Sequence, residues 1–376
     1  MRSVPALVVG VVVCLLTFIS VPAAQTPAER PLDIYFVDTE GGQATLYVAP
    51  SGQTLLVDTG NAGSRDLERI LAVLATAGVT RIDHLFLTHY HGDHYGNVID
   101  LAARMPVGHL YDHGASIEAD RPNVQAFEAR YAELYRKTPR RVVAPGDAVP
   151  VAGLETVVVA SHSRPLATPI KGAPGAGQAN AACAGVAPRD ESKVDPDNHY
   201  SAGFVMTFGR FRTVNLGDLT WSRELTLMCP VNPIGTVDLY LTTHHGLDQS
   251  GSPAVVHALR PRVAVMNNGT RKGGAVASFQ TLRSSPGLED IWQLHWSYHA
   301  GIEHNAPGVM IANLDDAAQV AAVVGGGAAG ATLPAGPGGN AAHTPAHYLK
   351  VSARRDGSFT VTNSRNGFTR TYAARP

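Results

Sequence analysis

The chain has 376 residues, of which 44% are hydrophobic and 16% are charged, and its formal net charge is −1. A chain of this length and apolar content can bury one large core or two ordinary ones. The near-zero net charge lacks the basic excess of a tight non-specific nucleic-acid binder, although a nuclease with a local basic patch stays compatible with it.

The N-terminus has the pattern of a secretory signal peptide. Arg2 supplies a positive charge, Ala6–Ile19 is almost wholly apolar, and small residues follow up to Ala24. The apolar run is short for a membrane span. We therefore expect residues 1–24 to be a signal peptide and the mature protein to be secreted or periplasmic, without a membrane segment. An uncleaved N-terminal anchor is the alternative.

Two cysteines, Cys183 and Cys229, would remain after cleavage. In an oxidising compartment they can form one disulfide, but two free thiols fit the sequence equally well.

Three strands are predicted at the start of the mature chain. Asp33–Val37 and Ala44–Val48 alternate roughly between apolar and polar residues, which is typical of a hairpin with one buried face. Thr54–Val57 is the third strand, and Asp58 follows directly. This carboxylate either supports a nearby site or is an ordinary turn aspartate.

A short apolar run, Leu85–Leu87, is followed at once by His89, His91, Asp93 and His94. Side chains two residues apart on an extended loop project to the same side, so the first two histidines can hold one borderline-soft cation such as zinc. Gly92 lets the chain bend, so that the next two ligands can face a second cation about 3.5–4 Å away. A merely solvated polar loop is the alternative, but this spacing after a strand favours a metal site.

Helices are expected on both sides of this loop. Leu67, Ile70, Leu71 and Leu74 give Asp66–Ala77 a helical spacing, and Tyr95–Met105 resumes helical character. The context of the metal loop is therefore strand, loop and helix.

The middle of the chain is less informative. Val124–Tyr135 is expected to be helical, and we expect short strands at Arg140–Val143, Gly146–Val149 and Glu155–Ala160. Ala167–Asp197 is rich in Gly, Pro and Ala, which predicts either a long functional loop or lid, or a disordered insertion.

Two scattered histidines lie at the ends of strand-like runs. His113 and His162 are candidates for the rim of the site, with ordinary surface or core histidines as the more common case.

Two later strands also end in ligand-type residues. The hairpin Ser201–Phe208 and Phe211–Asn215 is followed by Asp218, and the strand Val237–Thr242 is followed by His244 and His245. Three separate strand ends with metal-ligand chemistry indicate a single shared site.

The C-terminal part continues with a helix at Ser252–Leu259, a strand at Arg262–Met266, a helix at Ala275–Ser284 and a strand at Asp290–His295. We expect a catalytic domain over residues 31–316, an Ala/Gly/Pro linker over residues 317–346, and a small three-stranded β meander within residues 347–376.

The motifs H-Y-H-G-D-H, V-D-T-G and G-D-L resemble those of the metallo-β-lactamase superfamily, over roughly residues 33–300. Their layout is most similar to the branch that includes the soluble domain of bacterial competence (DNA-uptake) channel proteins and its free-standing exported relatives. The resemblance implies an α/β fold, an αββα sandwich of two mixed sheets with helices outside and metals at one edge.

The resemblance also implies ligands for two divalent metal ions. His89 and His91 would hold the first ion, Asp93, His94 and His245 the second, and Asp218 would bridge them. Asp58 would lie behind the ligands. The third ligand of the first ion is open among Asp195, Asp197, Asn198 and His199, and His199 has the most suitable chemistry. The resembling branch tends to place an Asn-x-x-Ser here, which Asn198 and Ser201 reproduce.

Besides the third ligand of the first ion, the chain differs from the resembling branch in the turn after the first strand. The branch usually has a G-Q-G-D turn there, whereas this chain has Glu40-Gly41-Gly42-Gln43.

We expect an exported hydrolase that uses a metal-bridged hydroxide, with zinc as the default metal and manganese or iron as alternatives. Asp93 would orient the water, and His244, Asn268 or Lys272 would contact the substrate, although a solvated loop lysine is the simpler reading of Lys272. A phosphodiester or other phosphoester is the favoured substrate, and a lactone, thioester or β-lactam is the alternative. A non-catalytic metal-binding interaction module is the alternative of another class. Partner proteins and oligomeric state are not indicated by the sequence.

Overall fold

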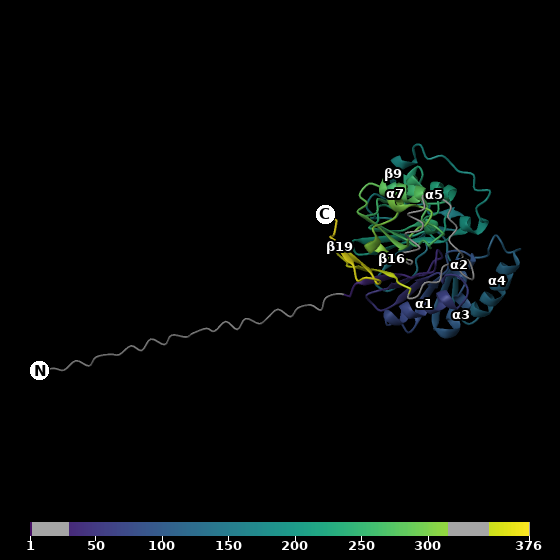
Figure 1. Ribbon diagram of the computed structural model, residues 1–376. Coiled ribbons are helices and arrows are strands. Elements are labelled where there is room, and N and C mark those ends of the chain that lie inside the picture. The colour runs from purple at the N-terminus through teal and green to yellow at the C-terminus, as the bar shows by residue number, and fades with distance from the viewer. Residues whose placement is uncertain (2–29, 315–345, 376) are drawn as a thin grey trace.

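The computed structural model describes residue 1 and residues 30–314 and 346–375, and Figure 1 draws the other residues in grey. The expected signal peptide and almost all of the expected linker therefore lie outside the described residues. Within the described part, no helix is both long and apolar enough to cross a membrane.

The first sheet has nine strands in the described part of the chain, and β1 to β6 are neighbours in both sequence and space. Strands β1, β2 and β3 pair antiparallel, whereas β3, β4, β5 and β6 pair parallel. The spatial order is β19 (Thr369–Tyr372), β18 (Phe359–Asn363), β17 (Leu349–Ala353), β1 (Leu32–Phe36), β2 (Thr45–Val48), β3 (Thr54–Val57), β4 (Ile82–Phe86), β5 (Val107–Asp112) and β6 (Arg140–Val142).

The second sheet has eight strands over the same residues, and it is also mixed. Its order is β16 (Ile311–Asn313), β15 (Asp290–His295), β14 (Val263–Met266), β13 (Leu239–Leu241), β11 (Phe211–Asn215), β10 (Gly203–Phe208), β7 (Glu155–Ser161) and β8 (Arg164–Pro165). Strands β11, β13, β14, β15 and β16 run parallel, so their carboxyl ends meet at one edge.

Three hydrophobic clusters define the four layers. The largest draws buried side chains from both sheets, including Phe86, Phe204 and Trp292, and lies between them. A second cluster packs α1 (Ser64–Thr76), α3 (Val98–Arg104) and α4 (Pro122–Tyr135) on the outer face of the first sheet. A third packs α5 (Trp221–Met228), α6 (Pro253–Leu259) and α7 (Val276–Arg283) on the second sheet. Figure 1 shows these two sets of helices on opposite sides of the molecule, which confirms the expected αββα sandwich.

The C-terminal strands β17, β18 and β19 form the expected antiparallel meander, and they continue the first sheet. Strand β17 pairs with β1 along five residues, from Leu32 opposite Ala353 to Phe36 opposite Leu349. On β18, the Phe359 ring lies 5.4 Å from that of Phe211 in the second sheet. The meander thus contributes side chains to the core between the sheets.

The long segment expected as a lid or a disordered insertion contains little regular structure. Its short strand β9 (Gln178–Ala179) pairs with β12 (Val231–Asn232), and Cys183 forms a disulfide with Cys229 at the end of α5. A disulfide and strand pairing therefore hold this segment against the part of the chain that follows α5.

Some local expectations were wrong. Residues Gly146–Val149 form a turn instead of a strand, because Gly146 has a positive φ of 94° and Asp147 accepts a hydrogen bond from the Ala144 amide. Helix α5 was not anticipated. The residues of α5 are mostly polar on one face, and this amphipathic helix becomes evident only once it covers the second sheet.

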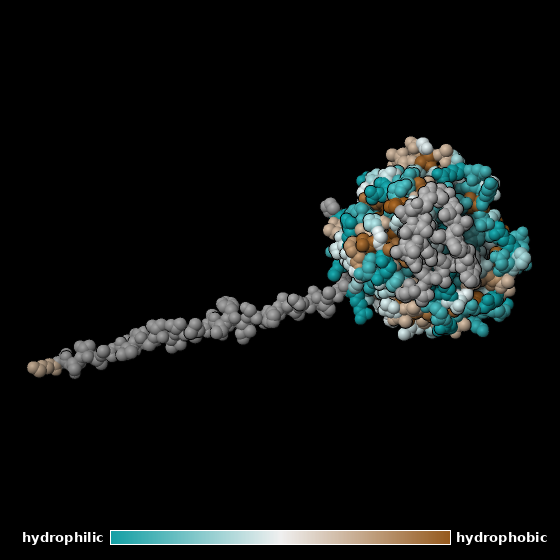
Figure 2. All heavy atoms as spheres, viewed as in Figure 1, coloured by the Kyte–Doolittle hydropathy of each residue, from teal (hydrophilic) through white to brown (hydrophobic). Residues whose placement is uncertain are grey.

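The surface in Figure 2 shows hydrophobic residues interspersed with hydrophilic ones on the visible, coloured part of that face. This is the usual distribution on folded domains.

Replacing Phe359 by alanine tests whether the meander belongs to the main cooperative unit. Phe359 is buried between the two sheets, so we expect Phe359→Ala to lower the free energy of unfolding by about 3–5 kcal/mol. Chemical denaturation followed by tryptophan fluorescence measures this, with the partly buried neighbour Thr360→Ala as the control. An unchanged main transition in Phe359→Ala would show that the meander unfolds independently.

Candidate metal centre

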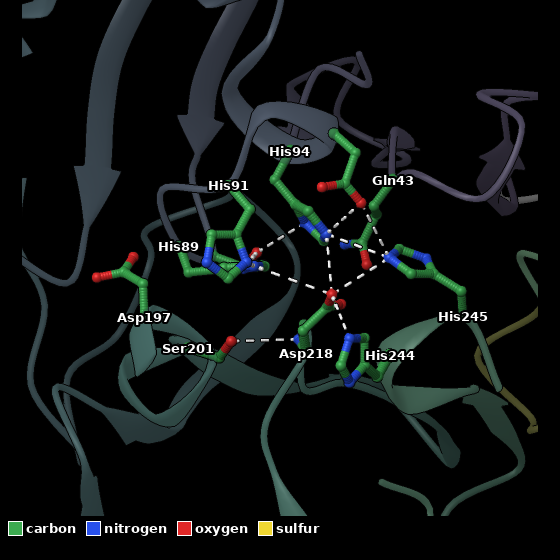
Figure 3. Close-up of polar contacts among 12 residues, drawn as sticks. Gln43, His89, His91, His94, Asp197, Ser201, Asp218, His244 and His245 are labelled. Carbon is green, nitrogen blue, oxygen red and sulfur yellow. Dashed lines mark hydrogen bonds and ion pairs between the residues drawn. The ribbon is translucent and has the colours of Figure 1, made fainter. Parts of the chain in front are cut away.

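Ligand-type side chains from both sheets meet where three strands end. The loop after β4 carries His89, His91 and, within the short helix α2 (Gly92–Tyr95), Asp93 and His94. The loop after β11 carries Asp218. In Figure 3, His91 and His94 descend from one side and Asp218 rises from the other.

The chain after β13 enters the short 3-10 helix η3 (Thr243–Gly246), which supplies His244 and His245. Both histidines have positive φ, of 54° and 56°. Strands β11 and β13 are parallel neighbours, so their ends lie at the same edge of the sheet. This brings Asp218 and His245 together at that edge.

A glycine allows the two sheets to approach at this point. A Cβ atom on Gly217 would lie 2.8 Å from the Cβ of Thr88, and Gly217 has a φ of 56°. Only glycine fits both the space and the conformation. The Asp218 turn therefore packs directly against the turn that begins the histidine loop.

Four side chains form one compact group. Single ligand atoms of Asp93, His94, Asp218 and His245 all lie within 4.8 Å of one another. Asp218 Oδ2 lies 3.2 Å from Nε2 of both histidines, and Asp93 Oδ2 lies 3.4 Å from the same two atoms. Donor atoms around a tetrahedral zinc ion, at bond lengths of about 2.1 Å, are about 3.4 Å apart. The group therefore fits one divalent cation.

A second pair of nitrogen atoms lies beside this group. His89 Nε2 is 2.9 Å from His91 Nδ1 and 3.9 Å from Asp218 Oδ2. His244 Nε2 also lies 3.4 Å from that oxygen. Six of the seven expected ligands, His89, His91, Asp93, His94, Asp218 and His245, thus converge, with His244 next to them.

The outer nitrogen of each histidine has a partner that orients the ring. His94 Nδ1 lies 2.8 Å from Asp58 Oδ2, and His91 Nε2 lies 3.1 Å from Glu118 Oε2. Corresponding contacts join His89 to Thr88, His245 to Asn267, and His244 to Ser250. A carboxylate or hydroxyl oxygen that accepts a hydrogen bond from the outer nitrogen keeps the hydrogen there and leaves the inner nitrogen free to bind a metal. The contact from Asn267 is made by its amide nitrogen, so it holds the His245 ring in place.

Asp58 is the most deeply placed of these partners. It is fully buried, and it accepts hydrogen bonds from the backbone N–H and the hydroxyl of Thr88, at 2.8 and 2.7 Å. It therefore orients His94 and also holds the start of the histidine loop, as expected for a carboxylate behind the ligands.

The charges of the group depend on one another. Burial alone would raise the pKa of Asp218, but the imidazoles of His245, His94 and His244 lower it well below its usual range. Burial would likewise lower the pKa of His94, but the carboxylates of Asp218, Asp93 and Asp58 raise it well above its usual range. The carboxylates of Asp218 and Asp93, whose pKa values are both lowered, are thus ionised, as metal binding requires.

His244 differs from the other histidines. Burial lowers its pKa to about 4, although the nearby Asp218 opposes the shift. The ring is therefore neutral near pH 7 and can accept or donate a hydrogen bond.

Three residues around the group were not anticipated as functional: Glu118, Asn267 and Gln43. Gln43 donates a hydrogen bond from Nε2 to Asn215 at 3.3 Å, and its backbone N–H donates to the carbonyl of Asp93. Figure 3 shows its side chain beside His94 and His245. Gln43 stands in the turn where the resembling branch has its G-Q-G-D sequence, which was the available signal.

Of the expected substrate contacts, Lys272 pairs through Nζ with Asp93 Oδ2 and is 42% exposed, so it offers a cation at the mouth of the site. Asn268 is instead buried and donates to the carbonyls of Gly269 and His295.

The remaining histidines take other partners. His199 Nδ1 lies 2.9 Å from Thr220 Oγ1 and 3.4 Å from Glu191 Oε2, and the described residues give no contact between His199 and the six convergent ligands. His113 Nε2 lies 3.1 Å from Asp197, and the His162 ring lies 4.3 Å from that of Tyr200. A ligand role for His199 stays a prediction.

A family model described as the metallo-beta-lactamase superfamily matches residues 38–260. The chain belongs to this superfamily. Its match spans β2 to α6 and includes every convergent ligand.

Curated relatives match shorter stretches. A metal-dependent hydrolase from Staphylococcus saprophyticus is 41% identical over 66 residues, which are 17% of this chain and 25% of that protein. An atrochrysone carboxyl ACP thioesterase from Pseudocercospora fijiensis is 33% identical over 105 residues, 28% of this chain and 31% of that protein. The chain thus spans about a quarter to a third of the length of these two relatives.

Among solved structures, the metallo-beta-lactamase fold protein YhfI from Bacillus subtilis has a TM-score of 0.43 and 12% identity, and covers 70% of this chain and 96% of that chain. A diphosphatase of the PhnP family has a TM-score of 0.37 and 12% identity, and covers 68% and 93%.

Removing the charge of Asp58 tests its role behind His94. We expect Asp58→Asn to weaken zinc binding by on the order of 10–100-fold. The reason is that His94 loses the carboxylate that keeps the ring hydrogen on Nδ1 and so leaves Nε2 free for the metal. Titration of the metal-free protein against a chromophoric chelator measures this. The control is Asp66→Asn, a buried aspartate on α1 that contacts Asn61 and Arg65 instead of a ligand. Equal weakening in both variants would contradict the assignment.

Proposed function

We propose that this metallo-hydrolase of the metallo-beta-lactamase superfamily holds two divalent metal ions, in the first instance zinc, and hydrolyses a phosphodiester or another phosphoester. The observation that carries the proposal is the position of Asp218 Oδ2. One carboxylate oxygen lies 3.2 Å from His94 and His245 and 3.9 Å from His89, so both sets of ligands share it. A shared carboxylate is the usual bridge in a two-metal site.

When bound, two divalent ions would lower the pKa of a shared water toward about 7 and neutralise negative charge that develops on the substrate. The chain's own residues supply the rest. Asp93, at the edge of the group and paired with Lys272, orients the attacking water. Neutral His244, held by Ser250, can donate a hydrogen bond to the leaving oxygen or accept one from the substrate.

Lys272 supports an anionic substrate. Its ammonium lies at the mouth of the site and is partly exposed, so a substrate phosphate can compete with Asp93 for it. The motif layout that resembles the competence-channel branch supports the same substrate class. The net charge of −1 offers no general attraction for long DNA.

An acyl substrate is the second candidate. The likeness to an atrochrysone carboxyl ACP thioesterase favours a thioester, and the same donor set serves lactones and β-lactams. A non-catalytic metal-binding module is the remaining alternative, and it predicts metal binding without turnover of any of these substrates.

We further propose that the protein acts outside the cytoplasm. The apolar N-terminal segment and the Cys183–Cys229 disulfide both support export to an oxidising compartment. Sequencing the N-terminus of the exported protein tests this, and we expect it to start near residue 24 or 25. An intact residue 1 in the exported fraction would favour the anchored alternative.

Turnover measurements with bis(p-nitrophenyl) phosphate, an acyl thioester, a lactone and a β-lactam separate the candidates. We expect the phosphodiester to give the highest kcat/KM. Asp218→Ala is expected to lower it on the order of a thousandfold or more, because the loss of metal charge stabilisation amounts to several kcal/mol and each factor of ten is about 1.4 kcal/mol.

Asp238→Asn is the control, since Asp238 lies before β13, at the end away from His244, and contacts Arg212 and Arg375. A zinc-loaded protein that turns over only an acyl substrate would overturn the proposed substrate class.

A further inference from the structure

The two sets of metal ligands differ in their number of protein donors. Asp93, His94, His245 and Asp218 make a complete set of four. On the other side, His89, His91 and Asp218 make three, and a tetrahedral ion needs a fourth donor from protein or water. A fourth protein donor would have to come from a segment that contacts these three residues.

One short turn is held against both of their segments. It is the 3-10 helix η2 (Pro196–Tyr200). At its start, Asp197 Oδ2 accepts a 2.7 Å hydrogen bond from the backbone N–H of Tyr90, the residue between His89 and His91. Just after it, Ser201 Oγ accepts a hydrogen bond from the backbone N–H of Asp218 at 3.2 Å. Figure 3 shows Asp197 on the side of His89 and Ser201 beside Asp218.

Asp197 itself is fully engaged elsewhere. Its Oδ1 accepts hydrogen bonds from the Ser116 hydroxyl and the Ile117 N–H, and its Oδ2 contacts His113 as well as Tyr90. In Figure 3 its carboxylate points away from the histidines. Asp197 therefore acts as an anchor for the turn.

Two other candidates also have different partners. His199 Nδ1 lies 2.9 Å from Thr220 Oγ1 and 3.4 Å from Glu191 Oε2. Asp195 is 59% exposed and pairs with Arg121.

Asn198 is left, between the two anchoring points. It is 2% exposed, and its Oδ1 has no hydrogen-bond partner among the described residues. Burying an amide oxygen without a hydrogen-bond partner costs about 1–3 kcal/mol of folding free energy. In native proteins such an atom therefore usually contacts an ion or an ordered water. Asn198 lies in η2, between Asp197, which holds the His89–His91 segment, and Ser201, which holds Asp218. An unpartnered amide oxygen in such a turn has the chemistry of a metal ligand.

We propose that Asn198 Oδ1 is the third protein ligand, besides the bridging Asp218, of the ion held by His89 and His91. The inference rests on the proposed two-metal centre. An amide oxygen is a weaker and harder donor for zinc than an imidazole. The ion beside Asn198 is therefore bound less tightly than the ion held by Asp93, His94 and His245, and the two sites fill in sequence.

Zinc titration of the metal-free mature protein, with a competing chromophoric chelator, tests this without reference to turnover. The wild type should bind two equivalents with distinct dissociation constants. Asn198→Ala should raise the larger constant at least tenfold and leave the smaller one within about twofold. His199→Ala should leave both within about twofold.

Two replacements of similar size guard against misfolding of the alanine variant. Asn198→Asp should lower the larger constant, because a carboxylate adds a negative charge to the donor set. Asn198→His should also lower it and, with cobalt bound as the second equivalent, change the visible absorption bands that report its donor atoms.

Asn180→Ala is the matched control. This asparagine lies in the same long segment, but its amide donates to the carbonyls of Met228 and Ala254. It should alter stability without altering either zinc constant.

Three results would overturn the proposal. The first is that Asn198→Ala leaves the larger zinc dissociation constant within twofold of the wild-type value. The second is that His199→Ala, and not Asn198→Ala, raises this constant. The third is a wild type that binds only one equivalent, which would also remove the two-metal basis. The first two would leave the proposed hydrolase intact, since phosphodiester turnover is measured separately.

Discussion

The structure depends on one buried carboxylate surrounded by imidazoles. Asp218 is 2% exposed, and its Oδ2 lies within 3.9 Å of Nε2 of His89, His94, His244 and His245. A buried charge without partners is strongly unfavourable, and four nitrogens around one oxygen are an arrangement that cations complete. The ligands are in turn held by Asp58, Glu118 and Asn267, so the group is oriented before a metal arrives.

The sandwich explains why this arrangement can form. The two sheets meet face to face through a shared core, and their strand ends at one edge bring residues 89–94 close to residues 218 and 244–245. Gly217 permits the close approach of the two turns, and Asp197 fixes the long segment against the histidine loop. The C-terminal meander extends the first sheet and fills the core on the far side, so it supports the sandwich rather than the site.

Much of the site was predictable because its information is local. His89, His91, Asp93 and His94 lie within six positions, and Asp218 and His245 each follow a recognisable strand. Their partners were not predictable in the same way. Glu118 and Asn267 lie in loops with no pattern of their own, and only the folded chain brings them to His91 and His245. In the sequence, His199 was the more suitable metal ligand, because an imidazole binds zinc better than an amide. In the structure its ring contacts Thr220, and Asn198 is the buried residue. Strand pairing between β1 and β17 is equally non-local, since more than 300 residues separate Leu32 from Ala353.

The central claim is that one oxygen of Asp218 serves two metal ions. Anomalous X-ray diffraction from crystals of the zinc-loaded protein tests it most directly. The account predicts two zinc peaks about 3.5–4 Å apart, on either side of Asp218, one beside His89 and His91 and one beside Asp93, His94 and His245. A single peak at full zinc loading, or peaks that Asp218 does not contact, would contradict it.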